Sequence, residues 1–373
     1  MRITFYAPFK PLGHARPSGD LAIAASIAAY LERHGHVVSR AGGTRMRWIY
    51  WRPWRWPAIL REYRRAVREH LRRPADLWLT YHAYYKAPDL LGPSVCRRTG
   101  VPYVIFQGIF STKRRRRIQT LPGYLLNRKA LTSASHLFAN RREDLRNLRR
   151  LVAEDRLTYI RPGIEPSLFG FNAEARAGLR REWAVGEAPV VLSAAMFRPG
   201  VKSEGLAWVI RSCGRLNRAG IPLLLAIAGD GRERARLVRL GERHLPRRVR
   251  FVGKLSRENM HRFYSAGDVF AFPGIRESLG MVYLESQSCG LPVVAFDNGG
   301  VPEVVANGET GLLTPPFDGP AFDRALAGLI LDSGLRGTMG ANARSHIRRS
   351  HDVEKNYAGM EAILSELVTG KQA

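Results

Sequence analysis

The chain is poor in cysteine and has no long apolar segment, and both absences narrow the class of protein. Its 373 residues include three cysteines, Cys96, Cys213 and Cys289, whose odd number and wide spacing disfavour a disulfide framework or a zinc site. No apolar run approaches the roughly 18 residues that cross a bilayer. The apolar stretch 21–31 follows a strand-like segment, so we interpret it as the first helix of a βα unit and not as a signal peptide. We therefore expect a cytoplasmic protein.

Acidic residues are scarce in the first half of the chain, which carries almost all of the net charge. Residues 1–164 contain 32 lysines and arginines against 10 aspartates and glutamates, a net charge of +22, while the whole chain has +27. An arginine-favouring genome would explain the abundance of arginine but not this asymmetry. The same half interleaves tryptophans with arginines over residues 45–78, and residues 113–117 read KRRRR.

Aromatic rings beside arginines favour the surface of an anionic membrane, because the rings sit at headgroup depth and each cation adds about 1 kcal/mol of attraction. We therefore predict peripheral attachment to the inner face of the cytoplasmic membrane. An anionic substrate such as a phosphorylated glycolipid is an alternative ligand of the same surface. Nucleic acid is a further alternative, but the chain has no zinc spacing, RNP-like motif or clear helix-turn-helix to support it.

Short β-rich runs alternate with helical stretches along the chain, which predicts α/β domains with parallel sheets. The predicted strands are residues 3–7, 77–81, 103–106, 137–139 and 158–160 in the first half, and 190–195, 223–228, 249–252, 269–271 and 293–296 in the second. A segment rich in proline and glycine, residues 161–171, lies between the halves. The sequence thus predicts two Rossmann-like domains, residues 1–164 and 165–352, with a last helix in residues 353–373.

Residues 273–314 contain the densest set of candidate ligand-binding residues. Glu277 and Glu285 flank Gly280, and a helix over residues 278–289 would place the two carboxylates roughly 12 Å apart. The N–H groups at the start of such a helix bind anions, while carboxylates accept hydrogen bonds from hydroxyl groups. The segment is therefore suited to a nucleotide-sugar, although it is also typical of an ordinary amphipathic αβ unit. The two interpretations are compatible.

The same segment resembles the donor-binding signature of the retaining glycosyltransferases of family 4. The resemblance continues through residues further along the chain: Gly299, Gly300, Pro302, Glu303, Gly308, Thr310, Gly311 and Leu312. One departure is Gly274, where the family usually has serine. The resemblance implies the GT-B fold, in which two Rossmann-like domains have parallel sheets facing a central cleft and the last helix crosses back onto the first domain.

This resemblance assigns site residues as well as the fold. It implies that Glu277 contacts the donor sugar, that Glu285 binds the nucleotide ribose, and that Arg198 and Lys202 clamp the diphosphate. The spacing of that arginine and lysine departs slightly from the family pattern. Backbone groups around the phosphates are expected from Ser278, Leu279, Gly280, Met281 and Val282, with Gly19 from a glycine loop and Gly253 and Lys254 near the base.

Two positions in the first half remain as candidates with open roles. Gln107 stands where many members of the family have a histidine near the donor sugar, and glutamine can hydrogen-bond there but cannot titrate. His14, in the loop that also holds Gly13, is a possible base, but a loop histidine without a visible partner is typically exposed.

The chain has no Asp-x-Asp motif, the usual carboxylate bridge between a divalent ion and a nucleotide-sugar. We therefore predict a metal-independent reaction with no cofactor beyond the nucleotide-sugar donor. By resemblance it is a retaining transfer from a UDP- or GDP-linked sugar to a hydroxyl group of a glycan or lipid-linked acceptor in bacterial envelope synthesis. The alternatives are a sugar-nucleotide epimerase of the same fold and a non-enzymatic basic protein that binds membranes or nucleic acid.

Overall fold

The chain forms two compact units, each built around its own six-stranded parallel sheet. The computed structural model describes residues 1–12 and 19–370. The first unit comprises Met1–Arg161 and Glu354–Ala373, and the second comprises Pro162–Val353. The strand order is β2-β1-β3-β4-β5-β6 in the first sheet and β12-β11-β10-β7-β8-β9 in the second.

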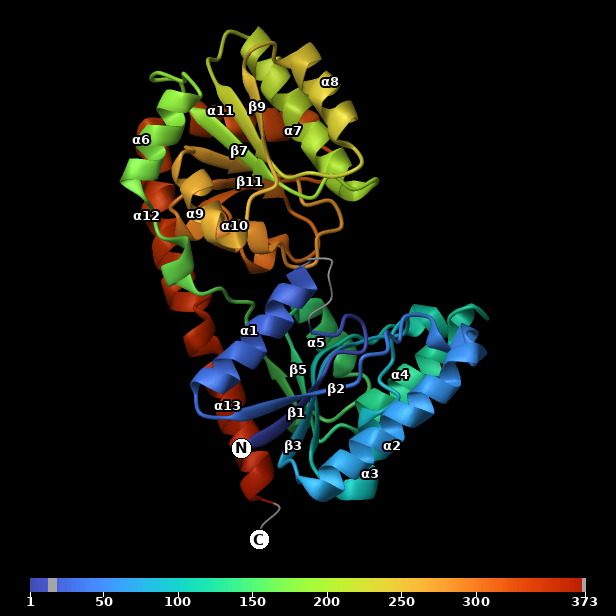
Figure 1. Cartoon of the computed structure of the whole chain (residues 1–373). Helices are drawn as coiled ribbons and strands as arrows, with labels where there is room; N and C mark the ends of the chain where they lie inside the picture. Colours follow the sequence, from blue (N-terminus) through green and yellow to red (C-terminus); the bar gives the residue numbers. More distant parts are fainter. Residues whose placement is uncertain (13–18, 371–373) are drawn as a thin grey trace. The chain divides into compact units, whose positions relative to one another are not determined.

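In the first unit, helices cover both faces of the sheet, with α2, α3 and α4 on one side and α1 and α13 on the other (Figure 1). The strands are β1 (Arg2–Tyr6), β2 (Val37–Ala41), β3 (Leu77–Ala83), β4 (Tyr103–Gly108), β5 (His136–Ala139) and β6 (Leu157–Tyr159). The helices are α1 (Gly19–Arg33), α2 (Trp56–Arg72), α3 (Gly92–Thr99), α4 (Leu121–Ser133), α5 (Arg142–Leu148) and α13 (Val353–Thr369). Because both faces are covered, every residue of β3 and β4 is buried.

The second unit has the same layered plan (Figure 1). Its strands are β7 (Val190–Ala194), β8 (Leu224–Ala228), β9 (Val249–Gly253), β10 (Val269–Ala271), β11 (Val293–Phe296) and β12 (Gly311–Thr314). Its helices are α6 (Ala173–Glu182), α7 (Val201–Arg218), α8 (Arg234–His244), α9 (Arg257–Ser265), α10 (Met281–Ser288), α11 (Gly319–Leu331) and α12 (Ser333–Ser350). Since all neighbouring strands are parallel, their carboxyl ends meet at one edge, where open α/β sheets bind ligands.

The ten predicted strands all exist in the structure, with ends shifted by at most two residues. The sequence did not predict β2 and β12, which are the outer strands of the two sheets on one side. The strand β2 reads VVSRA and is largely exposed, and β12 is only GLLT. Neither segment carries the buried apolar run that marked the central strands.

The last helix packs against the first unit through polar contacts with α1. The Tyr30 hydroxyl group donates a 2.7 Å hydrogen bond to Glu361 Oε2, and Glu354 forms an ion pair with Arg33.

At the amino edge of the second sheet, Asp268 accepts hydrogen bonds from Arg176, Arg180 and the Val190 backbone. Burial would raise the pKa of Asp268, but these partners hold it below its ordinary value. Asp268 therefore has a structural part in the sheet.

Candidate functional site

The carboxyl ends of β7, β8 and β9 hold three interlocked loops. The Gly229 amide donates a 2.8 Å hydrogen bond to the carbonyl of Gly253, and the Phe197 amide donates a 3.0 Å bond to the carbonyl of Asp230. A side chain on Gly229 would collide with the carbonyl of Ala195. The glycines therefore allow the loop after β7, which leads to Arg198 and α7, to lie directly on the turn after β8.

Lys202 and Glu277 meet at this edge although 75 residues separate them. Lys202 lies in the first turn of α7, and its Nζ forms an ion pair with Glu277 Oε2. The same Nζ lies 5.4 Å from the centroid of the Phe272 ring. The Glu277 side chain is 13% exposed against 33% for Lys202, so the pair is only partly hydrated. A partly buried pair of opposite charges that still reaches solvent is suited to a ligand with both anionic and hydroxyl groups.

Arg198 lies one turn before Lys202, in the exposed loop that starts α7. Its carbonyl accepts a 2.7 Å hydrogen bond from the Ser203 hydroxyl group. Gly200, in the left-handed region with φ of 95°, immediately precedes the helix. Both predicted cations therefore flank the N-terminus of an 18-residue helix, where the helix dipole adds positive potential.

The loop that carries Glu277 is formed by turns, and the helix begins only after it. The predicted helix over residues 278–289 is wrong at its start, because α10 begins at Met281. Gly280 precedes it in the left-handed conformation with φ of 68°, which glycine adopts without the steric cost of a Cβ. The separation of roughly 12 Å, which assumed a helix from residue 278, therefore does not apply to the two glutamates.

The backbone of this loop is tied to the neighbouring turn after β11. The Glu277 amide donates a 2.9 Å hydrogen bond to Gly274, and the Glu277 carbonyl accepts a 3.2 Å bond from the Gly300 amide. Arg276, a non-glycine residue, has a φ of 53°. Left-handed backbone at an ordinary residue costs of order 1–3 kcal/mol and clusters at ligand sites. Ser278, Leu279, Met281 and Val282 lie in or next to this segment, with Leu279 buried and the other three partly or fully exposed.

Glu285 lies one turn into α10, partly buried, and accepts a 2.9 Å hydrogen bond from the Tyr264 hydroxyl group. Burial raises the pKa of Glu285 from 4.5 to about 7, against the lowering effects of Tyr264 and of the charge of Arg257. The carboxyl group is therefore close to half ionised at neutral pH. A ligand that donates hydroxyl groups to it would favour the ionised form.

Gly274 replaces the usual serine for a steric reason. It has a φ of 70°, and a Cβ there would lie 2.5 Å from Tyr283 Oη, which donates a hydrogen bond to the Phe272 carbonyl. We expect Gly274→Ser to destabilise the second unit by about 2 kcal/mol or more, from backbone strain and overpacking. The measurement is urea-induced unfolding. The matched control is Gly186→Ser, where φ is 59° and the space is open. Equal losses for the two variants would contradict the steric argument.

In the first unit, Gln107 is joined by a residue that the sequence analysis missed. The register of β3 and β4 pairs Tyr81 with Phe106 and Ala83 with Gly108, so His82 stands beside Gln107 at the carboxyl edge. Both have positive φ, 60° and 62°. Both are buried, and Gln107 Oε1 is among the buried side-chain oxygens without a hydrogen-bond partner in the described part of the chain. Two strained residues side by side, one with an unused acceptor, make this position a candidate ligand contact.

His82 also contacts the start of α1. Its Nδ1 lies 3.2 Å from Asp20 Oδ1, and Asp20 follows Gly19, the first residue of the helix. Burial would raise the pKa of Asp20, but its contact with His82 brings the pKa below its ordinary value. The signal available in the sequence was the position of the histidine near the end of the mostly apolar run LWLTYHA. Gly13 and His14 lie outside the described residues.

Neither a metal cluster nor a membrane-spanning helix is found in the part of the chain that the structure describes. No group of three or more His, Cys, Asp or Glu side chains there could hold a metal ion. No helix of residues 1–12 and 19–370 combines the length and apolar character that a membrane span needs.

Lys254, predicted near the nucleotide base, is exposed just after β9.

Comparisons with known proteins match part of the chain to a family. Residues 180–346 match the family described as glycosyl transferases group 1. A GDP-mannose-dependent alpha-(1-6)-phosphatidylinositol monomannoside mannosyltransferase of Mycolicibacterium smegmatis is 32% identical over 196 residues, which are 50% of this chain and 50% of that protein. A D-inositol 3-phosphate glycosyltransferase of Kribbella flavida is 29% identical over 314 residues, 78% of this chain and 72% of that protein. The chain spans about half the length of the first of these relatives.

A solved structure supports the same fold over nearly the whole chain. HepE of Anabaena, in complex with UDP, matches with a TM-score of 0.78 at 20% identity and covers 98% of this chain and 100% of that chain. The match to a family of transferases does not favour the alternative of an epimerase. The resemblance predicted from residues 273–314 is confirmed: the chain has the GT-B fold, and its residues 180–346 match the family described as glycosyl transferases group 1.

Proposed function

We propose that the protein transfers a sugar from a nucleotide-diphospho-sugar to a hydroxyl group of an acceptor. The observation that carries this proposal is the pairing of Lys202 with Glu277 at the carboxyl edge of the second sheet. It puts a cation and a carboxylate together within the segment that matches the transferase family. A donor of this class offers an anionic diphosphate to the cation and sugar hydroxyl groups to the carboxylate.

The side chains of the second unit divide between the parts of the donor. Lys202 and Arg198 neutralise charge on the departing diphosphate, with the N-terminus of α7 behind them. Glu277 accepts hydrogen bonds from sugar hydroxyl groups, and Glu285 accepts them from the ribose. Gly280 and its four neighbours between Ser278 and Val282 supply backbone contacts to phosphate, while Gly253 and Lys254 lie near the base. Gln107 and Gly19 remain predicted donor contacts from the first unit.

The proposed reaction retains the anomeric configuration and proceeds on one face of the sugar. The acceptor oxygen bonds to the anomeric carbon as the bond from that carbon to the diphosphate breaks. The acceptor proton passes to a phosphate oxygen of the leaving nucleoside diphosphate. Each group on the protein then has one task, since the cations stabilise the leaving charge and the carboxylates hold the donor in position.

A divalent ion is not needed in this scheme, because Arg198 and Lys202 take its place at the diphosphate. We expect initial rates to stay unchanged when purified enzyme is assayed in excess EDTA. Added magnesium or manganese should then raise the rate by less than about twofold. A change of that size fits general screening of charge by salt, whereas restoring a catalytic metal ion would raise the rate far more. Loss of turnover in EDTA with recovery on adding one of these ions would contradict metal independence.

The acceptor we propose is a glycan or a lipid-linked glycan at the inner face of the cytoplasmic membrane, where a bacterial envelope polymer or glycolipid is built. The net charge of +22 over residues 1–164 supports an anionic surface as the partner of the first unit. The deciding experiment incubates the enzyme with a panel of UDP- and GDP-sugars and a membrane lipid extract, with mass spectrometry of released nucleotide and products. Conversion of a donor to its epimer in the absence of an acceptor would contradict the transferase proposal.

A further inference from the structure

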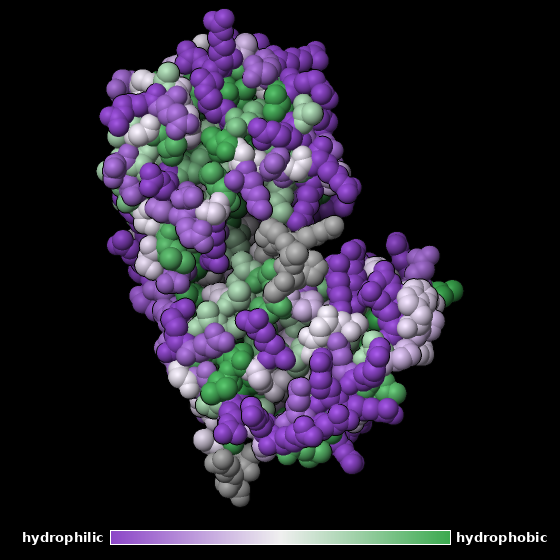
Figure 2. Space-filling model, viewed as in Figure 1, coloured by the Kyte–Doolittle hydropathy of each residue, from purple (hydrophilic) through white to green (hydrophobic). Residues whose placement is uncertain are grey.

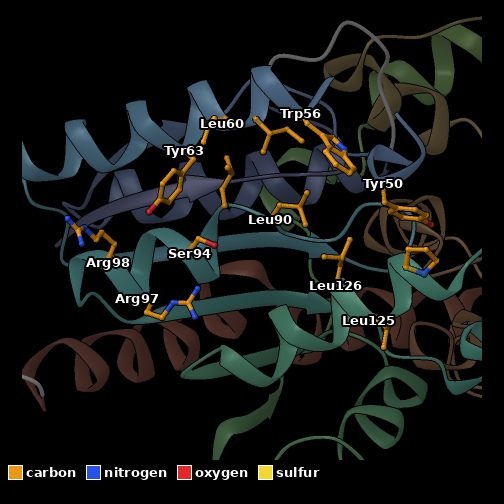
Figure 3. Close-up of a pocket in the computed structure, with 13 residues that line it drawn as sticks. Tyr50, Trp56, Leu60, Tyr63, Leu90, Ser94, Arg97, Arg98, Leu125 and Leu126 are labelled. Atoms are coloured by element: carbon orange, nitrogen blue, oxygen red, sulfur yellow. The ribbon is translucent and has the colours of Figure 1, made fainter. Parts of the chain in front are cut away.

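A long apolar groove runs between α2, α3 and α4 in the first unit, on a side of the sheet that the proposed reaction does not use. Its volume is about 1000 Å³, at the upper end for small-molecule sites. Leu60, Leu90 and Leu126 line its middle, and Trp56 lies toward one end. Figure 3 shows these side chains pointing into the space between the helices. We call this space the α2 groove.

The helix that forms one wall is unusually little buried. None of the 17 residues of α2 is buried, although tyrosine, isoleucine and leucine side chains face the groove. Trp56 and Leu60, which line the groove, are 53% and 48% exposed. In the space-filling view the surface over α2 is mainly hydrophilic, with isolated apolar side chains at its margins (Figure 2). An amphipathic helix that covers an unfilled apolar groove leaves apolar area for a ligand to bury.

The charge at the other end of the groove selects the chemistry of that ligand. Arg97 and Arg98, at the end of α3, line the groove opposite Tyr50 and Trp56 (Figure 3). In the described part of the chain neither guanidinium group has a hydrogen bond or an ion pair. Arg97 also lines a smaller hollow of about 300 Å³ together with Lys129, whose ammonium group is likewise unpaired among the described residues. Arg97 and Arg98 therefore supply two cations without carboxylate partners among the described residues where the apolar lining of the groove ends.

We propose that the α2 groove binds one acyl chain of an anionic membrane phospholipid, with the phosphate held by Arg97 and Arg98. The chain fills the apolar middle of the groove between the leucines of α2, α3 and α4. Arginine guanidinium groups form charge-assisted hydrogen bonds that suit a phosphate diester. This site does not depend on the proposed transfer reaction, because none of its residues belongs to the donor site.

The experiment measures equilibrium binding of a single-chain lipid to the full chain by calorimetry, below the micelle concentration of the lipid. The probe is myristoyl lysophosphatidylglycerol, and myristoyl lysophosphatidylcholine is its zwitterionic counterpart. We expect the anionic lipid to bind at least about tenfold more tightly, the scale of one charge-assisted hydrogen bond. Equal affinity for the two lipids, or no binding of the anionic one, would overturn the proposal.

Two pairs of variants test the position of the site. Leu60→Glu puts a carboxylate in the groove, while Leu71→Glu changes a more exposed leucine of the same helix, 72% against 48%, that does not line it. Arg97→Ala with Arg98→Ala removes the two cations, and Arg64→Ala with Arg65→Ala removes an adjacent pair elsewhere on the surface.

We expect each groove variant to weaken binding at least about tenfold and each control to stay within about twofold. Circular dichroism checks that all four proteins are folded. If a control loses as much affinity as its groove partner, the lipid binds by general charge or by another surface and the proposed site is wrong. Because no step uses turnover, failure here leaves the transfer reaction untouched.

Discussion

Replacement of Lys202 by alanine is expected to lower kcat about 100- to 1000-fold, the usual cost of removing one preorganised group that stabilises charge in a transition state. In the free protein the Lys202 ammonium group is held by Glu277 beside the Phe272 ring, at the N-terminus of α7. We infer that a bound diphosphate draws on the same charge. Since negative charge on that group grows as the glycosidic bond breaks, the effect should fall on kcat more than on KM.

The controls separate a local from a general effect of charge. Arg211→Ala removes a cation from the exposed face of the same helix and should leave kcat unchanged. Lys202→Ala also leaves the Glu277 carboxylate without its partner, which could itself destabilise the fold. The double variant Lys202→Ala with Glu277→Gln removes that unpaired charge and so tests whether misfolding causes the fall in kcat. Because the two residues interact, the losses of the single variants should not multiply in the double variant. Full activity in Lys202→Ala would remove the proposed role of the pair.

Donor binding is expected to become tighter as pH rises from 6 to 8, by about tenfold, because only the ionised Glu285 accepts two hydroxyl groups of a ribose. A pKa of about 7 leaves roughly a tenth of the carboxyl groups ionised at pH 6 and nine tenths at pH 8. The probe is an intact nucleotide-sugar without acceptor, because the terminal phosphate of a free nucleotide itself titrates near neutrality. Glu285→Gln should bind weakly at every pH and lose the slope.

Two further variants test the origin of this pH dependence. Tyr264→Phe removes the hydrogen bond that lowers the pKa of Glu285, so its binding curve should shift to higher pH while reaching a similar plateau. Glu309→Gln, at an exposed carboxylate elsewhere in the second unit, should leave the curve in place. If the affinity of the natural protein for the nucleotide-sugar does not change between pH 6 and 8, Glu285 is not the group that accepts the ribose hydroxyl groups.

The same carboxyl group should also affect stability in the absence of ligand. Its pKa is higher in the folded protein than the ordinary value of 4.5, so the folded state binds more protons between pH 4.5 and about 7. The free energy of unfolding contributed by this group therefore falls as pH rises through that range and stays low above it. We expect Glu285→Gln to gain on the order of 3 kcal/mol over the natural protein at pH 8 and nothing at pH 4, as measured by unfolding of the second unit.

Local pattern was sufficient for most of the architecture because a central parallel strand is buried on both faces. Segments such as LWLTYHA and VVLSA are apolar runs bounded by loops, and they became β3 and β7. The outer strand β2 carries Ser39 and Arg40, which its exposed position tolerates, so its composition resembled a loop. The start of α10 was placed three residues too early because Gly280 adopts a left-handed conformation at the helix boundary, where a Cβ would collide with the Tyr283 ring.

Sequence by itself indicated the resemblance to glycosyltransferases, the two sheets and the charged residues proposed for the candidate donor site, since each is written in short segments with recognisable spacing. Only the tertiary structure decided that Lys202 pairs with Glu277, that burial raises the pKa of Glu285, and that His82 stands beside Gln107. It also decided that α2 covers an unfilled groove. The physical reason is that ion pairing, desolvation and strand register depend on which distant segments pack together, and these contacts leave no trace in the spacing of neighbouring residues.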